Sequence, residues 1–235
     1  MSASFKYSGD ELVLFQHAKH WKKYFSQQIK PYIKGNVLEV GAGIGSTTLL
    51  LNDGSANQWL MLEPDEQMSA LLKMKVETNV LPGNSRLQTG TIDQLTSTFD
   101  TIIFIDVLEH IEKDAEEMKK AATLLNTGGY IVVLSPAFTY LFSPFDKAIG
   151  HYRRYNRKML RDIIPSGLQL VANRYYDTVG YFAALMNKWV LRQKYPTVNQ
   201  VRFWDKWMVP VSKVTDKLCL HSFGKSIIAV WKKIN

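Results

Sequence analysis

The stretch NVLEVGAGIG, at residues 36–45, joins a short apolar run to a loop with glycine at every second position. An apolar run that ends in glycines predicts a buried strand followed by a tight turn into a helix. Glycines at such a turn let the backbone approach a ligand closely, because no side chain stands in the way. The stretch therefore predicts a ligand-binding loop at the end of a strand.

More apolar runs follow this loop at regular intervals, with helical patterns between them. The predicted strands are QWLMLEPD (58–65), RLQTGT (86–91), FDTIIFIDVLEHI (99–111) and YIVVLSP (130–136), and the predicted helices span about 65–75 and 112–126. Continuous apolar strands that alternate with helices are typical of a parallel sheet covered on both faces. We therefore expect an α/β fold.

The flanking segments extend this pattern. We expect a helix at 9–30 that ends before Pro31, a loop at 137–155, a short helix at 156–164, a strand at 168–176, helices within 178–221 and a last strand at 225–233. The chain is predicted to be one domain over 1–235, made of a helical cap (1–35), a core (36–136), a loop with a helical insertion (137–224) and a final strand (225–235).

Composition narrows the class of protein. The chain has 235 residues, of which 46% are hydrophobic, and no apolar run reaches the roughly twenty residues needed to span a bilayer. Its first residues lack the pattern of a signal peptide. The single cysteine, Cys219, excludes an intramolecular disulfide and a cysteine-based metal cluster. These features favour a cytoplasmic enzyme.

Charge is distributed unevenly along the chain. The net charge is +8, but residues 151–235 hold 16 Lys/Arg and only 4 Asp/Glu, whereas residues 1–150 hold 13 and 17. A basic, aromatic-rich segment is compatible with nucleic acid, an anionic membrane surface or an anionic small substrate. It is equally compatible with a solvated basic face over a Trp-rich core.

An acidic residue refines the ligand of the glycine loop. Glu63 ends the second predicted strand, 22 residues after Gly41, where a carboxylate can accept hydrogen bonds from both hydroxyls of a ribose. The loop reads G-x-G-x-G followed by Ser46, not the G-x-G-x-x-G of a pyrophosphate-binding fold. A ligand with a ribose but no pyrophosphate is favoured over NAD, which argues against an oxidoreductase.

Five motifs carry a family resemblance. VLEVGAGIG, LEPD, TGTID, FDTIIFIDVLEHI and GGYIVVLSP, in this order and spacing, resemble the successive motifs of class I S-adenosylmethionine (SAM)-dependent methyltransferases. The resemblance covers about residues 18–136 and returns at the last strand. It implies a Rossmann-like seven-stranded sheet of order 3-2-1-4-5-7-6, with strand 7 antiparallel, and SAM as the cofactor.

The same resemblance assigns cofactor-binding residues. The methionine part of SAM would lie over Gly41, Ala42 and Gly43, in a loop that Glu39 shapes, and the ribose would be held by Glu63. The adenine would be flanked by Pro64 and Met68, and its edge would meet Gly90, Thr91 and Ile92. The pocket would also be lined by Asp106, Val107 and Leu108. For Met68, Val107 and Leu108, ordinary core packing is the alternative. For Glu39, the alternative is a strand-end charge satisfied by backbone amides.

Other residues bear on the methyl acceptor. The segment DKAIGHYRRY (146–155) is similar to the D-x-x-x-G-H-x-R-R-Y segment of a branch of bacterial methyltransferases that act on small molecules or on glycan- and lipid-linked acceptors. AKHWKKY (18–24) resembles the opening helix of that branch, except that His20 replaces the usual Asn, and it implies that Tyr24 touches the methionine end.

Three residues of this segment are predicted to act on the acceptor. An oxygen or nitrogen acceptor must lose a proton, so His151 is predicted to be the general base. Paired arginines suit a carboxylate or phosphate, so Arg153 and Arg154 are predicted to bind an anionic acceptor. The alternative for both arginines is a structural ion pair with Asp146, and the alternative for His110 is a capping or supporting role.

Several subclasses can be set aside. Asp106-Val107-Leu108-Glu109 stands where enzymes that methylate an exocyclic base nitrogen carry Asn/Asp-Pro-Pro-aromatic, and Cys219 follows Leu218 rather than the proline of a cytosine-C5 nucleophile. No His/Asp/Glu cluster has convincing metal spacing, so no metal is expected.

We predict a SAM-dependent methyltransferase that modifies an oxygen or nitrogen of a small, anionic metabolite or natural-product intermediate. The alternative is a methyltransferase for RNA or for a lipid- or glycan-linked acceptor, bound through the basic C-terminal third. No RNA-binding module signature appears, so nucleic acid ranks below a small molecule. Peripheral membrane contact by residues 178–221 and the oligomeric state stay open.

Overall fold

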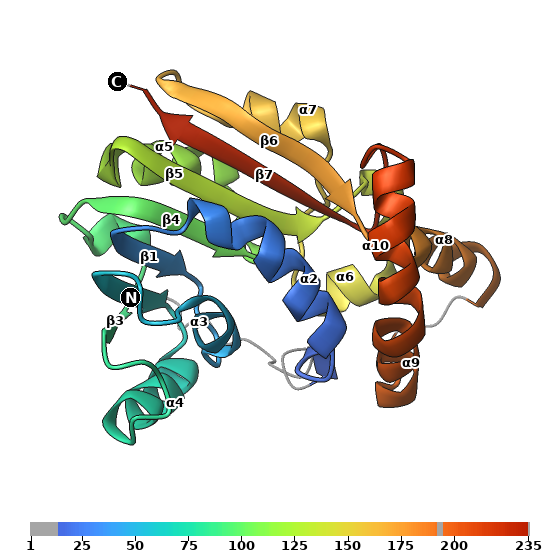
Figure 1. Cartoon of the computed structure of the whole chain (residues 1–235), viewed down its shortest axis with the longest axis horizontal. Helices are drawn as coiled ribbons and strands as arrows, with labels where there is room; N and C mark the ends of the chain where they lie inside the picture. The colour runs from blue at the N-terminus through green and yellow to red at the C-terminus, as the bar shows by residue number, and fades with distance from the viewer. Residues whose placement is uncertain (1–13, 192–194, 235) are drawn as a thin grey trace.

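A computed structural model describes residues 14–191 and 195–234 of the chain. Its centre is one seven-stranded sheet of order β3-β2-β1-β4-β5-β7-β6 (Figure 1). All neighbouring strands are parallel except β7, which is antiparallel to both β5 and β6. The strands are β1 (Asn36–Val40), β2 (Gln58–Glu63), β3 (Ser85–Thr89), β4 (Phe99–Ile105), β5 (Leu125–Pro136), β6 (Leu168–Tyr176) and β7 (Ser226–Lys233). The predicted fold class and strand order are confirmed.

The central strand β4 shows why these runs form a sheet with two covered faces. Ile102 and Phe104 are fully buried in one apolar cluster, and Ile103 between them is fully buried in the other. Successive side chains of a strand point to opposite faces, so both faces must be apolar when helices cover both.

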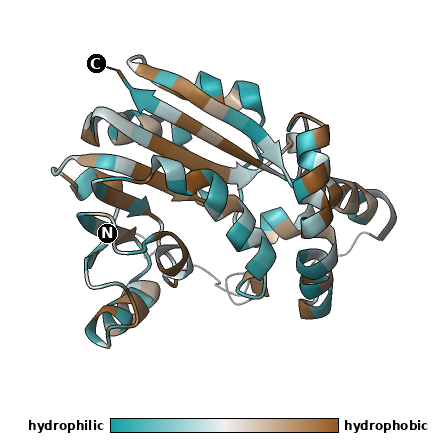
Figure 2. Cartoon of the chain, viewed as in Figure 1, coloured by the Kyte–Doolittle hydropathy of each residue, from teal (hydrophilic) through white to brown (hydrophobic). Residues whose placement is uncertain are grey.

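Helices pack on the two faces of the sheet. The α-helices are α2 (Lys19–Ile29), α3 (Ser46–Leu51), α4 (Glu66–Glu77), α5 (Asp114–Leu124), α6 (Pro144–Ala148), α7 (Arg157–Asp162), α8 (Thr178–Met186), α9 (Val198–Phe203) and α10 (Val209–Leu218). Buried side chains of α2, α3, α4 and α10 join the cluster on one face, and those of α5 and α7 join the cluster on the other. Figure 2 shows hydrophobic stretches along the central strands, whereas the edge strand β6 and the helices carry both hydrophobic and hydrophilic residues.

Three predicted boundaries differ from the structure. The predicted loop 137–155 contains the turn η4 (Thr139–Leu141) and the helix α6, which Ser143 and Asp146 begin with a capping box around Pro144. Strand β5 begins at Leu125 instead of 130, because Leu125 pairs with Phe99 across a register shift. The predicted helix 9–30 begins outside the described residues and is interrupted at residues 16–18. Helix α2 then runs from Lys19 to Ile29, before the turn η1 (Lys30–Tyr32), which holds Pro31.

The predicted helical insertion is present between β6 and β7. Its helices α8, α9 and α10 are linked by two π-helical turns, η5 (Asn187–Leu191) and η6 (Trp204–Met208). Figure 1 shows α8, α9 and α10 together on the right of the molecule, whereas α4 lies at the lower left beside β3. The division of the chain into cap, core and insertion stays a prediction.

Candidate active site

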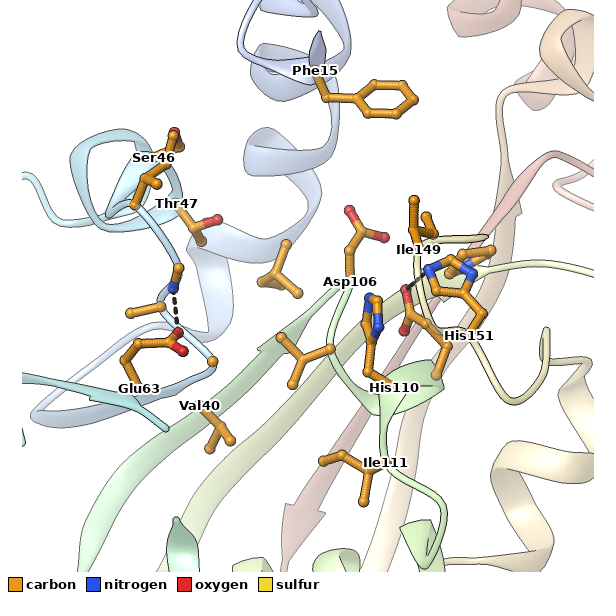
Figure 3. A pocket seen from close by; sticks show the side chains of 18 of the residues that line it. Phe15, Val40, Ser46, Thr47, Glu63, Asp106, His110, Ile111, Ile149 and His151 are labelled. Carbon is orange, nitrogen blue, oxygen red and sulfur yellow. Dashed lines mark hydrogen bonds and ion pairs between the residues drawn. The ribbon is translucent and has the colours of Figure 1, made fainter. Parts of the chain in front are cut away.

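A cavity of about 550 Å³ opens at the carboxyl ends of the parallel strands. The strand order reverses between β1 and β4, and crevices in α/β sheets form where the connections diverge in this way. The lining comes from α2, the glycine loop after β1, the ends of β2 and β4, the segment around α6, and the insertion. Figure 3 shows Glu63 and Ser46 on one side of it, His110 and His151 on the other, and Asp106 between them.

The glycine loop forms one wall of this cavity. Gly41, Gly43 and Gly45 all have positive φ, at 68°, 56° and 77°, a region that L side chains rarely adopt. A Cβ at Gly41 would lie only 2.7 Å from Cγ2 of Val107. The backbone N–H of Gly43 donates to Oε2 of Glu63 at 2.7 Å, so the loop is tied to the end of β2.

Glu63 has the properties expected of a ribose-binding carboxylate. It is buried and lines the cavity, and its Oε1 accepts from the backbone N–H of Asp65 at 2.9 Å. Burial raises the pKa of Glu63, although the backbone donors of Asp65 and Gly43 oppose that shift. Each carboxylate oxygen accepts one backbone hydrogen bond and keeps a second lone pair. The site therefore fits a ligand that presents two hydroxyl donors, as the ribose of SAM does.

Most of the predicted cofactor residues line this one cavity. They are Gly41, Ala42, Gly43, Glu63, Pro64, Met68, Gly90, Thr91, Ile92, Asp106 and Val107. These residues lie at the end of, or just after, four different strands, and the sheet brings them together because the carboxyl ends of parallel strands share one edge.

Three predicted cofactor residues do not line the cavity. The Tyr24 hydroxyl donates to Asp216 at 3.0 Å, so it ties α2 to α10 instead of facing the cofactor side. Leu108 is fully buried in the apolar cluster beside α5, which corresponds to the core-packing alternative. Glu39 is buried beneath the loop, where its Oε2 accepts from the Thr48 hydroxyl at 2.6 Å and from the indole N–H of Trp59 at 2.7 Å.

The burial of Glu39 makes folding depend on pH. Desolvation raises the pKa of Glu39 from 4.5 to about 7, against the opposing hydrogen bonds of Thr48 and Trp59. The folded state thus holds this proton more tightly than the unfolded state, so the stabilisation is present below pH 4.5 and is lost as pH rises through 7. We expect the free energy of unfolding, measured by urea denaturation relative to Glu39→Gln, to fall by about 3 kcal/mol over that range. Exposed Glu77→Gln is the control, and an identical pH slope in wild type and Glu39→Gln would contradict this origin.

Asp106 lies at the centre of the cavity, directly after β4. Its φ of 53° is uncommon for a residue other than glycine, although Asp tolerates it better than most. Its side chain is exposed to the open cavity, although enclosure by the cavity walls raises its pKa to about 6, against the opposing charges of His151, Lys225 and Lys22. Strained backbone of this kind is frequent at functional sites.

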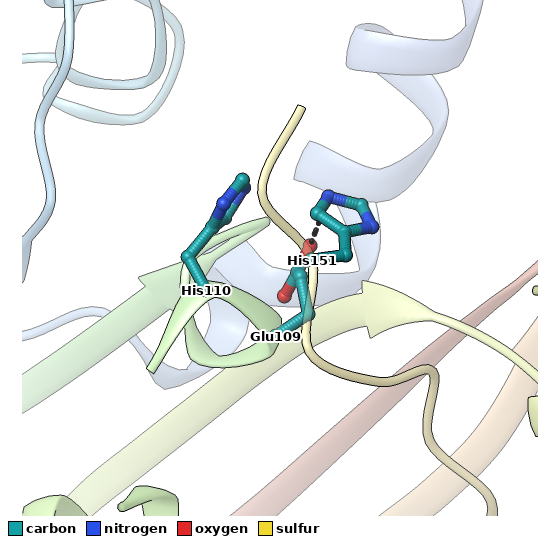
Figure 4. A group of neighbouring side chains, drawn as sticks. All are labelled: Glu109, His110 and His151. Carbon is teal, nitrogen blue, oxygen red and sulfur yellow. Dashed lines mark ion pairs between the residues drawn. The ribbon is translucent and has the colours of Figure 1, made fainter. Parts of the chain in front are cut away.

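The far wall of the cavity carries two histidines and a buried glutamate (Figure 4). Nδ1 of His151 lies 3.0 Å from Oδ1 of Asp146, and its Nε2 lies 3.9 Å from Oε1 of Glu109. The rings of His151 and His110 meet edge to face, with centroids 4.5 Å apart. Glu109 is fully buried, and its Oε2 accepts from the Ser135 hydroxyl at 2.9 Å. Its Oε1 has no hydrogen-bond partner among the described residues.

The same three side chains could hold a metal ion. One ligand atom from each of Glu109, His110 and His151 lies within 4.8 Å of the others, and burial lowers the pKa of His110 to about 3, which keeps that ring neutral. Two of these groups are oriented by neighbours, since Asp146 contacts His151 and Ser135 donates to Glu109. Side chains that bind metal ions are commonly oriented in this way. Sequence spacing did not indicate this cluster, because His151 is 41 residues from His110. The expected absence of a metal stays a prediction, which activity in the presence of a chelator would check.

The two predicted arginines have different positions. Arg154 binds Asp146 with two hydrogen bonds, from Nε at 2.8 Å and Nη2 at 2.9 Å, and it lines the cavity. Its Nη1 is buried and has no hydrogen-bond partner among the described residues. Arg153 turns away from the cavity, because it pairs with Asp114 and donates to the backbone carbonyl of Glu112. This corrects the expectation that both arginines face the acceptor.

Sequence reasoning missed several residues of the site. Lys22 and Lys225 line the cavity, and Nζ of Lys225 lies 4.1 Å from the ring centroid of Trp204, which also lines it. Burial lowers the pKa of both lysines, and nearby carboxylates oppose the shift. Lys22 belongs to the opening-helix motif and could have been singled out, whereas no local pattern marks Lys225 or Trp204.

A family model described as "Methyltransferase domain" matches residues 14–177. The chain belongs to this methyltransferase family. The match covers the predicted motifs, and a class I methyltransferase of this kind uses SAM as its methyl donor.

Solved structures share the fold of this methyltransferase at low sequence identity. One is a chain of the complex between the Haloferax volcanii Trm112 methyltransferase activator and a methyltransferase, with 14% identity, a TM-score of 0.65 and coverage of 99% of this chain and 100% of that one. Another is coclaurine N-methyltransferase bound to N-methylheliamine and S-adenosylhomocysteine, with 10% identity, a TM-score of 0.60 and coverage of 92% and 72%. A third is magnesium protoporphyrin IX methyltransferase from Synechocystis with bound S-adenosylhomocysteine, with 17% identity, a TM-score of 0.55 and coverage of 93% and 82%.

Proposed function

We propose that this methyltransferase transfers the methyl group of SAM to an oxygen or nitrogen of a small, anionic acceptor. The observation that carries the proposal is the Arg154 guanidinium, which lines the cavity and has a buried Nη1 without a hydrogen-bond partner among the described residues. A buried N–H donor without a partner is costly, so a ligand that accepts from it is favoured. A carboxylate or phosphate oxygen is the strongest such acceptor.

The glycine loop and Glu63 would hold the cofactor on one side of the cavity. Gly41 and Gly43 line the cavity with positive φ, and Glu63 offers carboxylate lone pairs for two ribose hydroxyls. When bound, SAM supplies a methyl group on a positively charged sulfur. The residues around that position orient the two reactants and exclude water, and these contributions account for much of the rate in displacement reactions.

The opposite side of the cavity would hold the acceptor. Lys22, Arg154 and Lys225 reach the lining from three separate parts of the chain, and together they suit a negatively charged group. Asp106, Glu109 and Asp146 lie among them, so the acceptor's anionic group is expected near the three cations and its reacting atom near His151.

His151 would remove the proton of the acceptor. Asp146 holds its Nδ1 at 3.0 Å, so Nδ1 carries the hydrogen and Nε2 is left to accept a proton. Nε2 lies 3.9 Å from Oε1 of Glu109, a fully buried carboxyl whose pKa burial raises well above its usual range. If the acceptor is already ionised, only its positioning is needed.

The direct test is a turnover assay with a panel of carboxylated, phosphorylated, phenolic and amine acceptors, read as formation of S-adenosylhomocysteine. We expect turnover with an acceptor that carries an anionic group, and loss of that turnover when the group is esterified. Turnover only with neutral acceptors would contradict the anionic class and leave the methyltransferase assignment untouched.

Arg154 and Arg153 provide a matched pair for testing acceptor binding. Arg154→Lys keeps a cation beside Asp146 but removes the Nη1 donor, so we expect the acceptor KM to rise about ten-fold or more. Arg153→Lys is the control, because Arg153 faces Asp114, and its KM is expected to stay at the wild-type value. An unchanged KM in Arg154→Lys would remove the guanidinium from the acceptor site.

A further inference from the structure

Exposed apolar side chains form a line along the outer face of the insertion. Phe203, Trp207, Val211, Val214 and Leu218, here called the outer stripe, are 60%, 57%, 51%, 59% and 76% exposed. Their spacing of four, four, three and four residues places them on one side of the helical run α9–η6–α10. Single exposed apolar residues are ordinary, but a continuous line of them marks an interaction surface.

The opposite side of the same helices is fixed to the core. Val201, Trp204, Val209 and Ser212 are buried, and the Ser212 hydroxyl donates to Asp177 at 2.7 Å. The helices therefore cannot rotate to bury the outer stripe without exposing an equally apolar side.

Basic residues accompany the outer stripe, and acidic residues do not. Arg202, Lys206, Lys213 and Lys217 lie along α9, η6 and α10, and all but Lys213 are exposed. The only acidic residues between positions 178 and 221 are Asp205 and Asp216, and both are buried. Asp205 accepts from the backbone N–H groups of His20 and Trp21, and Asp216 from those of Asp177 and Thr178. The outward face of this run thus carries positive charge and no exposed carboxylate.

The neighbouring helix extends the apolar surface. Phe182, Met186 and Trp189, on α8 and η5, are 55%, 60% and 68% exposed. The start of α8 is held against α10, because the backbone N–H of Val179 donates to the Ser212 hydroxyl at 3.1 Å. Figure 1 shows α8, α9 and α10 clustered at the same end of the molecule.

We propose that the outer stripe and its flanking lysines bind the surface of an anionic phospholipid membrane. A helix with Trp, Phe and Leu on one line and Lys/Arg beside it lies in the headgroup region, where apolar side chains enter the acyl boundary and cations meet lipid phosphates. A second copy of the chain is a poorer occupant, since it would bring two lysine-rich faces together. A neutral membrane would leave the three exposed cations, Arg202, Lys206 and Lys217, without counter-charges.

The described part of the chain contains no helix with the length and apolarity needed to span a bilayer.

The test is co-sedimentation of the full chain with vesicles of phosphatidylcholine alone or of phosphatidylcholine with 30% phosphatidylglycerol. We expect binding to the anionic vesicles, weaker binding at high salt, and little binding to the neutral ones. The double variant Val214→Ser/Lys217→Glu should reduce the partition coefficient by about ten-fold or more. The matched control is Val80→Ser/Lys73→Glu, which alters a valine that is 52% exposed and an exposed lysine, both in or next to α4 and far from α10 (Figure 1).

Several outcomes would overturn this proposal. They are no binding of wild type to anionic vesicles, equal binding of the two double variants, or sedimentation of wild type as a dimer that Val214→Ser/Lys217→Glu dissociates. Salt-sensitive binding to generic RNA without binding to vesicles would also overturn it. SAM affinity of both variants, measured by calorimetry, shows that they are folded, because neither variant alters the cavity.

Discussion

Replacing His151 with alanine is expected to lower kcat by roughly 10²–10⁴-fold, with the affinity for SAM unchanged. The reason is that His151 is the cavity-lining histidine whose Nδ1 is anchored by a carboxylate, at 3.0 Å from Asp146, so that its Nε2 can receive a proton from the acceptor. It lies across the cavity from Glu63, and its loss should leave the cofactor side intact. Single-turnover rates and calorimetric SAM binding would separate these two effects.

The control for this experiment is His221→Ala. His221 does not line the cavity, and its Nδ1 lies 3.1 Å from the backbone carbonyl of Tyr175. A fall in kcat below ten-fold for His151→Ala would show that positioning alone drives the reaction. Complete loss of activity on chelation, restored by a divalent metal ion, would instead assign His151 to a metal site with Glu109 and His110.

Replacing Gly43 with valine is expected to weaken SAM binding by roughly a hundred-fold or more. Gly43 has a φ of 56°, where a β-branched residue is strongly disfavoured, and its backbone N–H holds Glu63 at 2.7 Å. Gly43 also lines the cavity, so a change of its backbone conformation alters the cavity wall. Calorimetry with S-adenosylhomocysteine measures the loss directly.

Glu63→Ala is the milder comparison for that experiment. It removes a carboxylate but no backbone constraint, so we expect about ten-fold weaker cofactor binding. Gly83→Val is the control for the glycine change, because a Cβ at Gly83 has open space around it and Gly83 does not line the cavity. Equal cofactor affinity in Gly43→Val and Gly83→Val would place the cofactor elsewhere.

Local sequence pattern determined the sheet and the cavity wall to which we assign the cofactor. The apolar runs at β1, β2, β4 and β5 each carry enough hydrophobic side chains to need burial on both faces, and that need alone indicates a parallel sheet. The glycine loop and Glu63 were predictable for a related reason. The loop directly follows β1 and Glu63 is the last residue of β2, and the carboxyl ends of parallel strands converge on one edge.

Tertiary structure decided the acceptor side. Arg153 and Arg154 are neighbours in sequence, yet one pairs with Asp114 and the other with Asp146, because the chain after α6 runs irregularly and sends successive side chains to opposite sides. Trp204 lines the cavity from η6 of the insertion, and Lys225 lines it from the position just before β7. Glu109 lies 3.9 Å from His151, although 41 residues separate them in sequence. No periodicity links such positions, since their contact arises only when the insertion packs on the sheet. Strand patterns are local and repeat along the chain, so the sequence by itself determined the fold and the glycine loop. The contacts around His151 depend on long-range packing, which only the folded molecule defines.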